Sequence, residues 1–577
     1  MSQADVLALF NCLVIEDDTT KGKLYTKLAK NGVVLDFKPD HTQKDAIKQV
    51  YPPLPLRTFF SYEERTEGDL VQLLVKQLLH YYEVYGLNQP GAFTVLSDEG
   101  KKIISMRHIM GITKSELGDK VRTLLYSNAP IDDLAPLKRI IQAFDIKYNI
   151  NSIQNNEARV LLWDEYQNAF ESGDDVVRYI CYLATENTML IKSPDVLEKV
   201  RATYYPPVLF EKHIYPLSQV FNRHKKVIMS AKRDDNKTFI NRISRLSKMT
   251  HVPVRESIAK TFIHKAFKRE VGADVLDKIH LRDKFKYLNL LSYKKCKHSH
   301  NIYRIRNGKV WHKPVDKHYP LPEIERIEGW VLESIKKDLS HLEGKVVLLD
   351  PVVDYGLPTS RKQVLGNLPV GTTITIDKGK VAVGVHWKNE DGARDLDLSA
   401  IDYTNGNRIG WGTWAGFEGS DVIFSGDVTD APGKGAMEFL VTKKGQHAVA
   451  INIFSGEIGA AASLVVGKHK KDAWSWIHDV RVTEKCTLES KNSMFGYMKG
   501  STFVVYPARL SGRAVSTYDA TMQMCSVEFW TVGKLLKALD FDFMLASHDD
   551  IEYSTNFDYD LKYSVFSYDK LEDLMRI

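Results

Sequence analysis

The chain has 577 residues, of which 44% are apolar and 26% charged, and it carries a formal net charge of +6. This length exceeds what one ordinary hydrophobic core supports, and this composition excludes a long disordered chain, so we expect at least two folded domains. No stretch approaches the roughly 18 uninterrupted apolar residues that a membrane-spanning helix needs.

The cysteine content indicates the compartment. The five cysteines are widely scattered, and their number is odd. A disulfide framework is not expected at such a density, which favours a reducing, intracellular setting. The short apolar pieces near the N-terminus lack a preceding basic region, so they do not resemble a signal peptide. We therefore expect a soluble cytoplasmic protein.

Residues 1–205 are predicted to form a mostly helical domain. Apolar side chains recur there at helical spacing, and capping residues precede several of the runs. The predicted helices cover Leu70–Tyr81, a segment that starts at the capping pair Thr113 and Glu116, Ala158–Phe170, Val176–Leu183, and a segment that starts at Ser193-Pro194-Asp195. Because no fixed repeat period is present, we expect an irregular helical domain or a degenerate helical array, which would dock protein partners.

Residues 206–322 are predicted to form a basic helical region followed by a linker. From Glu211 to His318 the chain carries 27 Lys and Arg residues against 9 Asp and Glu residues. The helical pattern continues from Lys225 to Tyr293, whereas Asn307–Pro322 is rich in Gly, Pro and charge and is predicted to be the linker. A charge asymmetry of this kind bears on partners and not on fold.

The basic region has two interpretations. Its cations could neutralise nucleic-acid phosphates, with interleaved tyrosines stacking on bases. The candidate contacts are Arg223, Lys225, Lys226, Lys232, Arg233, Arg242, Arg245, Lys268 and Arg269. Because no recognised nucleic-acid motif accompanies them, we favour the alternative of a solvated surface that docks on the acidic part of the chain.

Residues 323–577 are predicted to form a connecting helix and then a β-sandwich with an acidic C-terminal tail. Beyond Gly344 the period of the apolar residues changes from 3.6 to 2, and Val381–Trp387 has the alternation of a half-buried strand. Further short strands and a terminal helix are predicted at Asp421–Ser425, Met437–Val441, Ala448–Phe454 and Tyr568–Met575. The predicted fold class is multidomain α+β, with a mostly α-helical N-terminal half and a β-sandwich in the C-terminal half.

Two aspartates on one predicted strand could bind a metal ion. Asp395 and Asp397 are two residues apart, so on an extended strand their carboxylates point to the same side. Asp427 follows another apolar run, where a loop could bring a third oxygen ligand. Calcium takes six to eight oxygen ligands, so backbone carbonyls and water would complete the shell.

The same segments resemble the TerD-type domains of the tellurium-resistance and bacterial stress-protein family. Asp395–Ser399 is similar to the family's DLDxS element, Ser425–Glu438 to its acidic loop, and Ile453–Gly456 to the turn after that loop. Ser360-Arg361, with Leu368–Gly371, resembles the lead-in seen in large bacterial proteins that end in this fold. The N-terminal half resembles only the uncharacterised helical regions of those large bacterial proteins. The resemblance implies a calcium-binding β-sandwich with the ligand set Asp395, Asp397, Asp427, Asp430 and Glu438.

The chain also departs from the family pattern. Lys434, Ala436 and Met437 stand where calcium-ligating aspartates are expected. A lysine ammonium repels a cation and offers it no lone pair. We therefore expect one Ca²⁺ site at most.

No enzymatic signature is present in the sequence. It lacks a phosphate-binding loop of the GxxxxGK[ST] type, HExxH, GxSxG and CxxC. We expect a non-enzymatic stress-response or interaction protein with protein partners and without a small-molecule substrate. The alternatives are a nucleic-acid-binding protein that acts through residues 211–318 and a phage-encoded structural or packaged protein.

Overall fold

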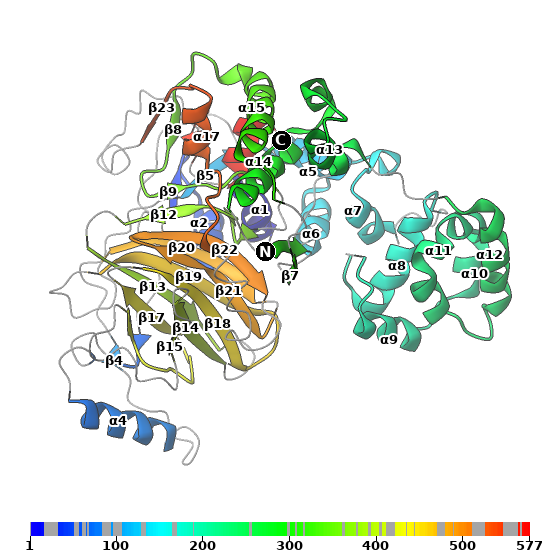
Figure 1. The fold of residues 1–577 in the computed structure, drawn as a ribbon. Helices are drawn as coiled ribbons and strands as arrows, with labels where there is room; N and C mark the ends of the chain where they lie inside the picture. The colour runs from blue at the N-terminus through cyan, green and yellow to red at the C-terminus, as the bar shows by residue number, and fades with distance from the viewer. Residues whose placement is uncertain are drawn as a thin grey trace. The chain divides into compact units, whose positions relative to one another are not determined.

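A computed structural model describes most of the chain. The described residues are 2–16, 33–50, 57–60, 65, 69–82, 94–95, 107–127, 134–163, 170–188, 190–252, 257–296, 300–305, 309–314, 318–359, 364–376, 379–389, 394–402, 407–410, 422–433, 435–442, 445–469, 479–488, 490–509, 525–545, 564–565 and 568–576. Helices predominate in the N-terminal half and antiparallel sheets in the C-terminal half, so the fold is α+β (Figure 1). No helix in these ranges is both long and apolar enough to cross a membrane.

The chain forms two compact units. Unit 1 comprises Met1–Leu9, Val14–Asp18 and Ile112–Lys260, and unit 2 comprises Phe10–Leu13, Thr19–Gly111 and Thr261–Ile577. Each unit therefore combines segments that are far apart in the sequence. The three-part division of the chain made from composition and charge stays a prediction.

Unit 1 is built from helices. They are α5 (Lys114–Tyr126), α6 (Ala135–Phe144), the 3-10 turn η4 (Ile150–Ser152), α7 (Asn156–Leu161), α8 (Gly173–Thr185), α9 (Pro194–Ala202), α10 (Pro207–Lys212), α11 (Ile214–Ser230) and α12 (Lys237–Thr250). The capping box of Thr113 and Glu116 at the start of α5 is confirmed, as is the cap by Ser193 ahead of α9. Apolar side chains of α8, α11 and α12 share one core, which includes Ile180, Phe221 and Ile243.

One helix prediction in unit 1 is wrong in extent. Helix α7 ends at Leu161, whereas the sequence predicts a helix as far as Phe170. Residues 164–169 lie outside the described part, and Phe170 is not helical. Its backbone N–H donates to His213 Nε2 at 2.7 Å, and its ring stacks on Trp163 with 3.4 Å between ring centroids. The N–H of Phe170 therefore bonds a side chain and not a helical carbonyl.

The N-terminal part of the chain adds short strands and helices. They are α1 (Ser2–Phe10), β1 (Cys12–Val14), β2 (Val33–Leu35), α2 (His41–Val50), β3 (Arg57–Thr58), α4 (Leu70–Tyr82), β4 (Thr94–Val95) and β5 (Arg107–Ile112). Strands β1, β5 and β2 form one small sheet in that order, and β3 pairs with β4. Helix α4 confirms the helix predicted from the spacing of its leucines.

Helices and one pair of strands precede the large sheets of unit 2, and the first of these helices begins at the end of unit 1. The elements are α13 (Ile258–Phe267), the 3-10 segment η6 (Ala273–Lys278), α14 (Leu281–Lys295), β6 (His300–Ile305), β7 (Lys309–Pro314), α15 (Leu321–Asp338) and η8 (Ser340–Leu342). The predicted linker is wrong over 309–314, because β7 pairs antiparallel with β6 and parallel with a strand of the large sheet. Val310 and Trp311 are residue types that are enriched in strands, but the nearby glycine and prolines favoured a linker.

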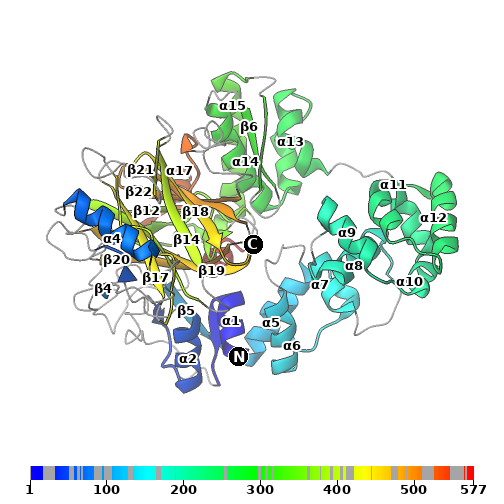
Figure 2. The same ribbon diagram turned by 90° about the horizontal axis from the view of Figure 1, so that it is seen from below.

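The C-terminal strands form two antiparallel sheets in unit 2. The main path of the larger sheet has the order β15-β14-β18-β21-β22-β12-β9, and the smaller sheet has the order β16-β17-β13-β19-β20. Strands β7 and β6 extend the larger sheet, since β7 pairs parallel with β22 and β6 pairs antiparallel with β7. The strands are β9 (Val353–Asp354), β12 (Thr373–Thr375), β13 (Lys380–Trp387), β14 (Asp395–Asp402), β15 (Arg408–Gly410), β16 (Val422–Phe424), β17 (Ala436–Thr442), β18 (His447–Ser455), β19 (Ala460–His469), β20 (Asp479–Leu488), β21 (Asn492–Lys499) and β22 (Thr502–Arg509). Figures 1 and 2 show the two sheets beside each other.

Small elements complete unit 2. They are β8 (Val347–Leu349), β10 (Val364–Leu365), β11 (Leu368–Pro369), α17 (Val532–Ala538), β23 (Phe543–Leu545), β24 (Ser564–Val565) and α19 (Tyr568–Met575). Strand β8 pairs parallel with β23 and β24. The terminal helix predicted at Tyr568–Met575 is confirmed.

Strand β13 is buried on both faces, which corrects the half-buried strand that its alternation predicts. Its valines and Trp387 occupy one face, and the residues between them are also buried. Ala382 lies in a second apolar cluster with Phe439 and Val465. Small residues alternate with large ones here because bulky neighbours cover the second face, not because that face meets water.

Candidate metal centre

Strand β14 holds the first two acidic residues of the site. It pairs with β18 along its whole length, and its register shifts by one residue between Asp395 and Leu396. Asp395 and Asp397 lie on one face of the strand, while Leu396 and Leu398 lie on the other and are fully buried. The alternation of aspartate and leucine therefore sets two carboxylates side by side at the end of a buried strand.

A tight turn after β16 delivers the third acidic residue. Gly426, which precedes Asp427, has a φ of 95°. A Cβ atom at this position would lie 2.6 Å from the ring of Phe60, so both the backbone conformation and the available space require glycine. The turn is held to β17 by Ser425, whose Oγ accepts from the N–H of Phe439 at 2.8 Å.

The structure brings Asp395, Asp397 and Asp427 together. One carboxylate oxygen of each lies within 4.8 Å of the corresponding oxygen of the other two. All three side chains are buried, with exposed fractions of 3%, 2% and 6%. Three carboxylates at this spacing repel one another, so bound protons or a cation must offset their charge.

Burial and mutual repulsion perturb the acidity of the cluster. Burial raises the pKa of Asp397 to about 7, and the negative charge of Asp427 adds to the effect. A hydrogen bond from Asn452 and the positive charge of Arg408 act in the opposite direction. The fully buried carboxyl of Glu438 also has a raised pKa, first through burial and then through the charges of Asp427 and Asp397.

Glu438 supports the site from β17. Its Oε2 accepts from the N–H of Leu398 at 2.7 Å, and its Oε1 accepts from the N–H of Val428 at 2.9 Å. These two bonds tie β14 and the turn that carries Asp427 to the same side chain. Glu438 does not belong to the group of mutually close carboxylates found in the described residues, so we assign it a positioning role.

Asp430, the remaining predicted ligand, faces a different partner. Its Oδ1 accepts from Asn389 Nδ2 at 2.6 Å. The side-chain oxygen of Asn389 in turn accepts from the N–H groups of Arg394 and Ala431, at 3.0 and 3.3 Å. Asp430 and Asn389 therefore hold the loops on either side of the site, and Asp430 is not among the three clustered carboxylates.

The residues that depart from the family pattern lie mostly in strand β17. Ala436 is buried opposite Trp387 of β13, and Met437 is buried in the apolar cluster around Phe439. Lys434 lies outside the described residues. The resemblance to TerD-type domains predicts further ligands at Ala436 and Met437, but these residues are the first two of strand β17 and have apolar side chains.

The sequence patterns did not predict two polar contacts of the site. Asn452 of β18 is opposite Asp397 in the register and donates to its Oδ2 at 3.0 Å. Arg408 of β15 donates to Ser399 Oγ from Nη2 at 2.8 Å, and its charge acts on Asp397. An asparagine within the apolar run Ala448–Phe454 was the only sequence signal for the first contact, and the second depends on strand pairing.

The basic residues singled out in the sequence are divided between the two units. Those from Arg223 to Arg245 belong to unit 1, and Lys268 and Arg269 belong to unit 2. In unit 1, Arg223 donates from Nη1 to Asp174 at 2.7 Å, and Arg233 donates to backbone carbonyls. Both of these arginines are therefore engaged in internal contacts.

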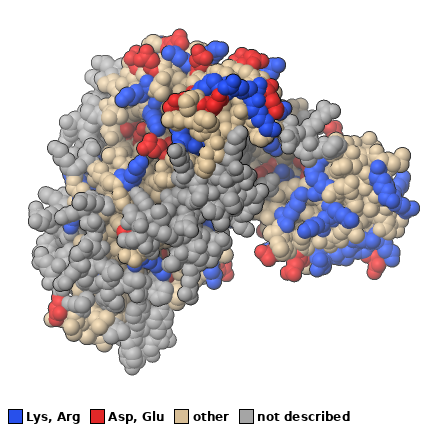
Figure 3. All heavy atoms as spheres, in the orientation of Figure 1, with Lys and Arg blue, Asp and Glu red and all other residues tan. Residues whose placement is uncertain are grey.

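The other predicted cations of unit 1 lie on its surface. Lys225 and Lys226 of α11 are exposed, as are Arg242 and Arg245 of α12. Lys232 is partly buried, and its Nζ lies 2.9 Å from Asn241 Oδ1. Figure 3 shows Lys and Arg side chains gathered over helices α8–α12 on the face in view. The exposed cations are available to solvent or to a ligand.

Comparisons with known proteins identify no relative of this chain. No protein-family model matches it. Neither a curated protein nor a solved structure matches it. The likeness to TerD-type domains rests on the sequence elements at Asp395–Ser399, Ser425–Glu438 and Ile453–Gly456 and stays a prediction.

Proposed function

We propose that the two C-terminal sheets form a TerD-like β-sandwich that binds one Ca²⁺ ion through Asp395, Asp397 and Asp427, in a non-enzymatic stress-response or interaction protein. The observation that carries this proposal is the spacing of three buried carboxylate oxygens, each within 4.8 Å of the others. Glu438 holds the strand and the turn in register for them.

The donor set suits a calcium ion. Calcium binds hard oxygen ligands at about 2.3–2.6 Å, so two ligand oxygens of one ion can be up to about 4.6–5.2 Å apart. The spacing of the three aspartates falls within this span. Three carboxylates supply part of a shell of six to eight oxygens, and carbonyls and water would supply the rest. A bound ion would also offset the charge of Asp427, which adds to the effect of burial in raising the pKa of Asp397.

A calorimetric titration of the full chain with CaCl₂ tests the proposal. We expect one site in the wild type and its loss in Asp427→Asn, which keeps the size of the side chain but removes its charge. Glu457→Gln is the matched control, because Glu457 is an exposed acid on the turn after β18. Absence of heat and of any rise in melting temperature at millimolar Ca²⁺ would refute the site, and so would equal affinity in Asp427→Asn.

Nucleic-acid binding through unit 1 is a second candidate function. It is favoured by the exposed Lys225 and Lys226 on α11 and Arg242 and Arg245 on α12. Helices α11 and α12 pack on each other, and Thr250 Oγ1 donates to Ser218 Oγ at 2.8 Å between them. Exposed cations on neighbouring helices can follow a phosphate backbone, and no base-specific contact is implied.

Salt dependence distinguishes this function from a merely solvated surface. We expect retention on a heparin column that Arg242→Glu with Arg245→Glu abolishes. The matched control is Lys199→Glu with Arg201→Glu, which makes the same charge change on exposed positions of α9. Counterion release predicts a steep fall of affinity with salt. Flow-through at physiological salt, or equal loss in the control, would remove this candidate.

A further inference from the structure

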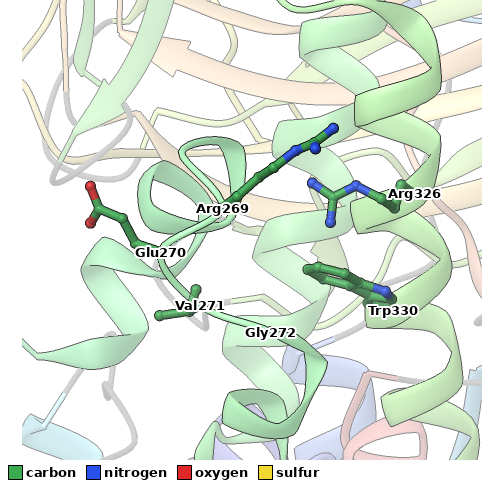
Figure 4. Close-up of a pocket in the computed structure, with 6 residues that line it drawn as sticks. All are labelled: Arg269, Glu270, Val271, Gly272, Arg326 and Trp330. Atoms are coloured by element: carbon green, nitrogen blue, oxygen red, sulfur yellow. The ribbon is translucent and has the colours of Figure 1, made fainter.

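A cavity in unit 2 lies apart from the acidic cluster. It has a volume of about 470 Å³ and is lined by Arg269, Glu270, Val271, Gly272, Arg326 and Trp330. The first four residues form the turn between α13 and η6, and the last two lie on α15 (Figure 4). This volume falls within the range of about 300–1,000 Å³ that is typical of small-molecule sites.

Arg326 and Trp330 present one face of α15 to the cavity. They are four residues apart, so their side chains lie on the same side of the helix. The guanidinium carbon of Arg326 is 4.3 Å from the centre of the Trp330 ring, and Figure 4 shows the two groups stacked. Together with Val271, the indole supplies a flat apolar surface beside a cation.

Arg269 reaches the same place from an unusual backbone position. Helix α13 ends in a Schellman motif, in which the N–H of Glu270 donates to Lys265 O at 2.9 Å and the N–H of Arg269 to Ala266 O at 3.1 Å. The residue at this left-handed position is usually glycine, but here Arg269 adopts a φ of 60°. In Figure 4 its side chain extends toward Arg326, whereas Glu270 points away.

Glu323 fixes the two guanidinium groups. Arg269 Nη2 donates to its Oε1 at 2.5 Å, and Arg326 Nη2 donates to its Oε2 at 2.7 Å. The hydrogen bond from Arg269, followed by that from Arg326, lowers the pKa of Glu323, so this carboxylate is charged at neutral pH. Arg269 and Arg326 against Glu323 leave one positive charge among these three side chains, and the carboxylate of Glu270 is paired with Lys268, with 3.8 Å between Oε1 and Nζ.

The arginines keep donors for a ligand. In the described part of the chain, Arg326 donates from Nε and Nη2, and Arg269 from Nη2. Each guanidinium has five N–H donors, so the Nη1 groups of both arginines remain for an anion. Guanidinium groups held in a fixed orientation favour phosphate, which accepts two parallel N–H bonds.

We propose that this cavity binds a mononucleotide-sized ligand, with its phosphate on Arg269 and Arg326 and its flat ring against Trp330 and Val271. The phosphate pairs with the positive charge that Glu323 does not neutralise, and the base packs against the apolar side chains. This site is independent of the calcium site, since it uses none of the same residues. The phosphate contacts supply most of the affinity, and the ring contact makes a nucleotide bind more tightly than free phosphate.

Titration calorimetry at low salt tests the proposal on the full chain, with adenosine monophosphate, inorganic phosphate and adenosine as probes. We expect adenosine monophosphate to bind at least about tenfold more tightly than either fragment. Arg269→Gly should weaken it by at least about tenfold, because it removes a charge-assisted hydrogen-bond donor. This variant places the preferred glycine at the left-handed position, so its turn should stay folded. Trp330→Leu should lower the affinity for adenosine monophosphate but not that for phosphate.

Lys278→Ala is the matched control. Lys278 carries the same charge on the neighbouring segment η6, is exposed, and does not line the cavity. It should leave the affinity unchanged. Three results would overturn the proposal: no heat with adenosine monophosphate at about 1 mM, equal affinity for adenosine monophosphate and phosphate, or an equal effect of Arg269→Gly and Lys278→Ala.

Discussion

Replacing Asp397 by asparagine should stabilise the calcium-free protein at alkaline pH. Burial and the charge of Asp427 raise the pKa of Asp397 from its ordinary 3.8 to about 7. Each pKa unit corresponds to about 1.4 kcal/mol, so ionising this carboxyl at pH 8 costs the folded state about 4 kcal/mol. Asparagine cannot ionise and avoids this cost.

The direction of the pKa shift sets the sign of the effect on stability. Because the folded state holds the proton more tightly than the unfolded state, the contribution of Asp397 to stability is complete below pH 4. It is lost as the pH rises through about 7. Asp397→Asn should therefore exceed the wild type by up to about 4 kcal/mol at pH 8. A weaker bond with Asn452 reduces this gain by about 1 kcal/mol, and the gain vanishes near pH 4.

Hydrogen exchange measured in EDTA at pH 5 and pH 8 is the appropriate assay. Protection factors of peptides from β14 and β18 report on this sheet alone, whereas a single melting curve averages over two units. Addition of Ca²⁺ should reverse the order, because only the wild type gains from binding. Glu457→Gln should behave as the wild type throughout. Equal pH dependence in Asp397→Asn and wild type would refute the reasoning.

Three further predictions concern the supports of the fold. Glu438→Ala should lower the free energy of unfolding by about 2–4 kcal/mol, since two buried backbone amides lose their acceptor, and Glu438→Gln should lose less in the same exchange assay. Gly426→Ala should cost about 2 kcal/mol or more and weaken Ca²⁺ binding; Gly433→Ala, with a φ of 61° in open space, should cost less and leave binding intact in calorimetry. Lys284→Ala should cost about 2–3 kcal/mol in the exchange protection of peptides from α14 and α15, because Lys284 is 1% exposed and its Nζ lies 2.6 Å from Asp338; adding Asp338→Leu should recover part of the loss.

Local signals predicted much of the secondary structure. The capping box at Thr113 and the serine cap at Ser193 depend on residues within one helical turn, and both are present as expected. The strand that carries Asp395 and Asp397 was predicted for the same reason, since alternation is a property of consecutive residues. The proximity of Asp427 was anticipated as a loop contribution, and the structure places it beside the other two.

Features that depend on pairing between distant segments could not be predicted from the sequence. Strand β7 looked like a linker because its partner β6 and its neighbour β22 are what define it as a strand. Asn452 supports Asp397 only through the register of β14 with β18. The meeting of Arg269 with Trp330 across the cavity depends in the same way on how α13 and α15 pack, and no spacing in the sequence encodes it.

A crystal structure determined with calcium present tests the cation site most directly. We predict one ion between Asp395, Asp397 and Asp427, with a carboxylate oxygen of each at about 2.3–2.6 Å. Glu438 should keep its bonds to the backbone amides of Leu398 and Val428 and stay out of the first shell. Density for water alone between the three carboxylates at millimolar Ca²⁺ would contradict the site.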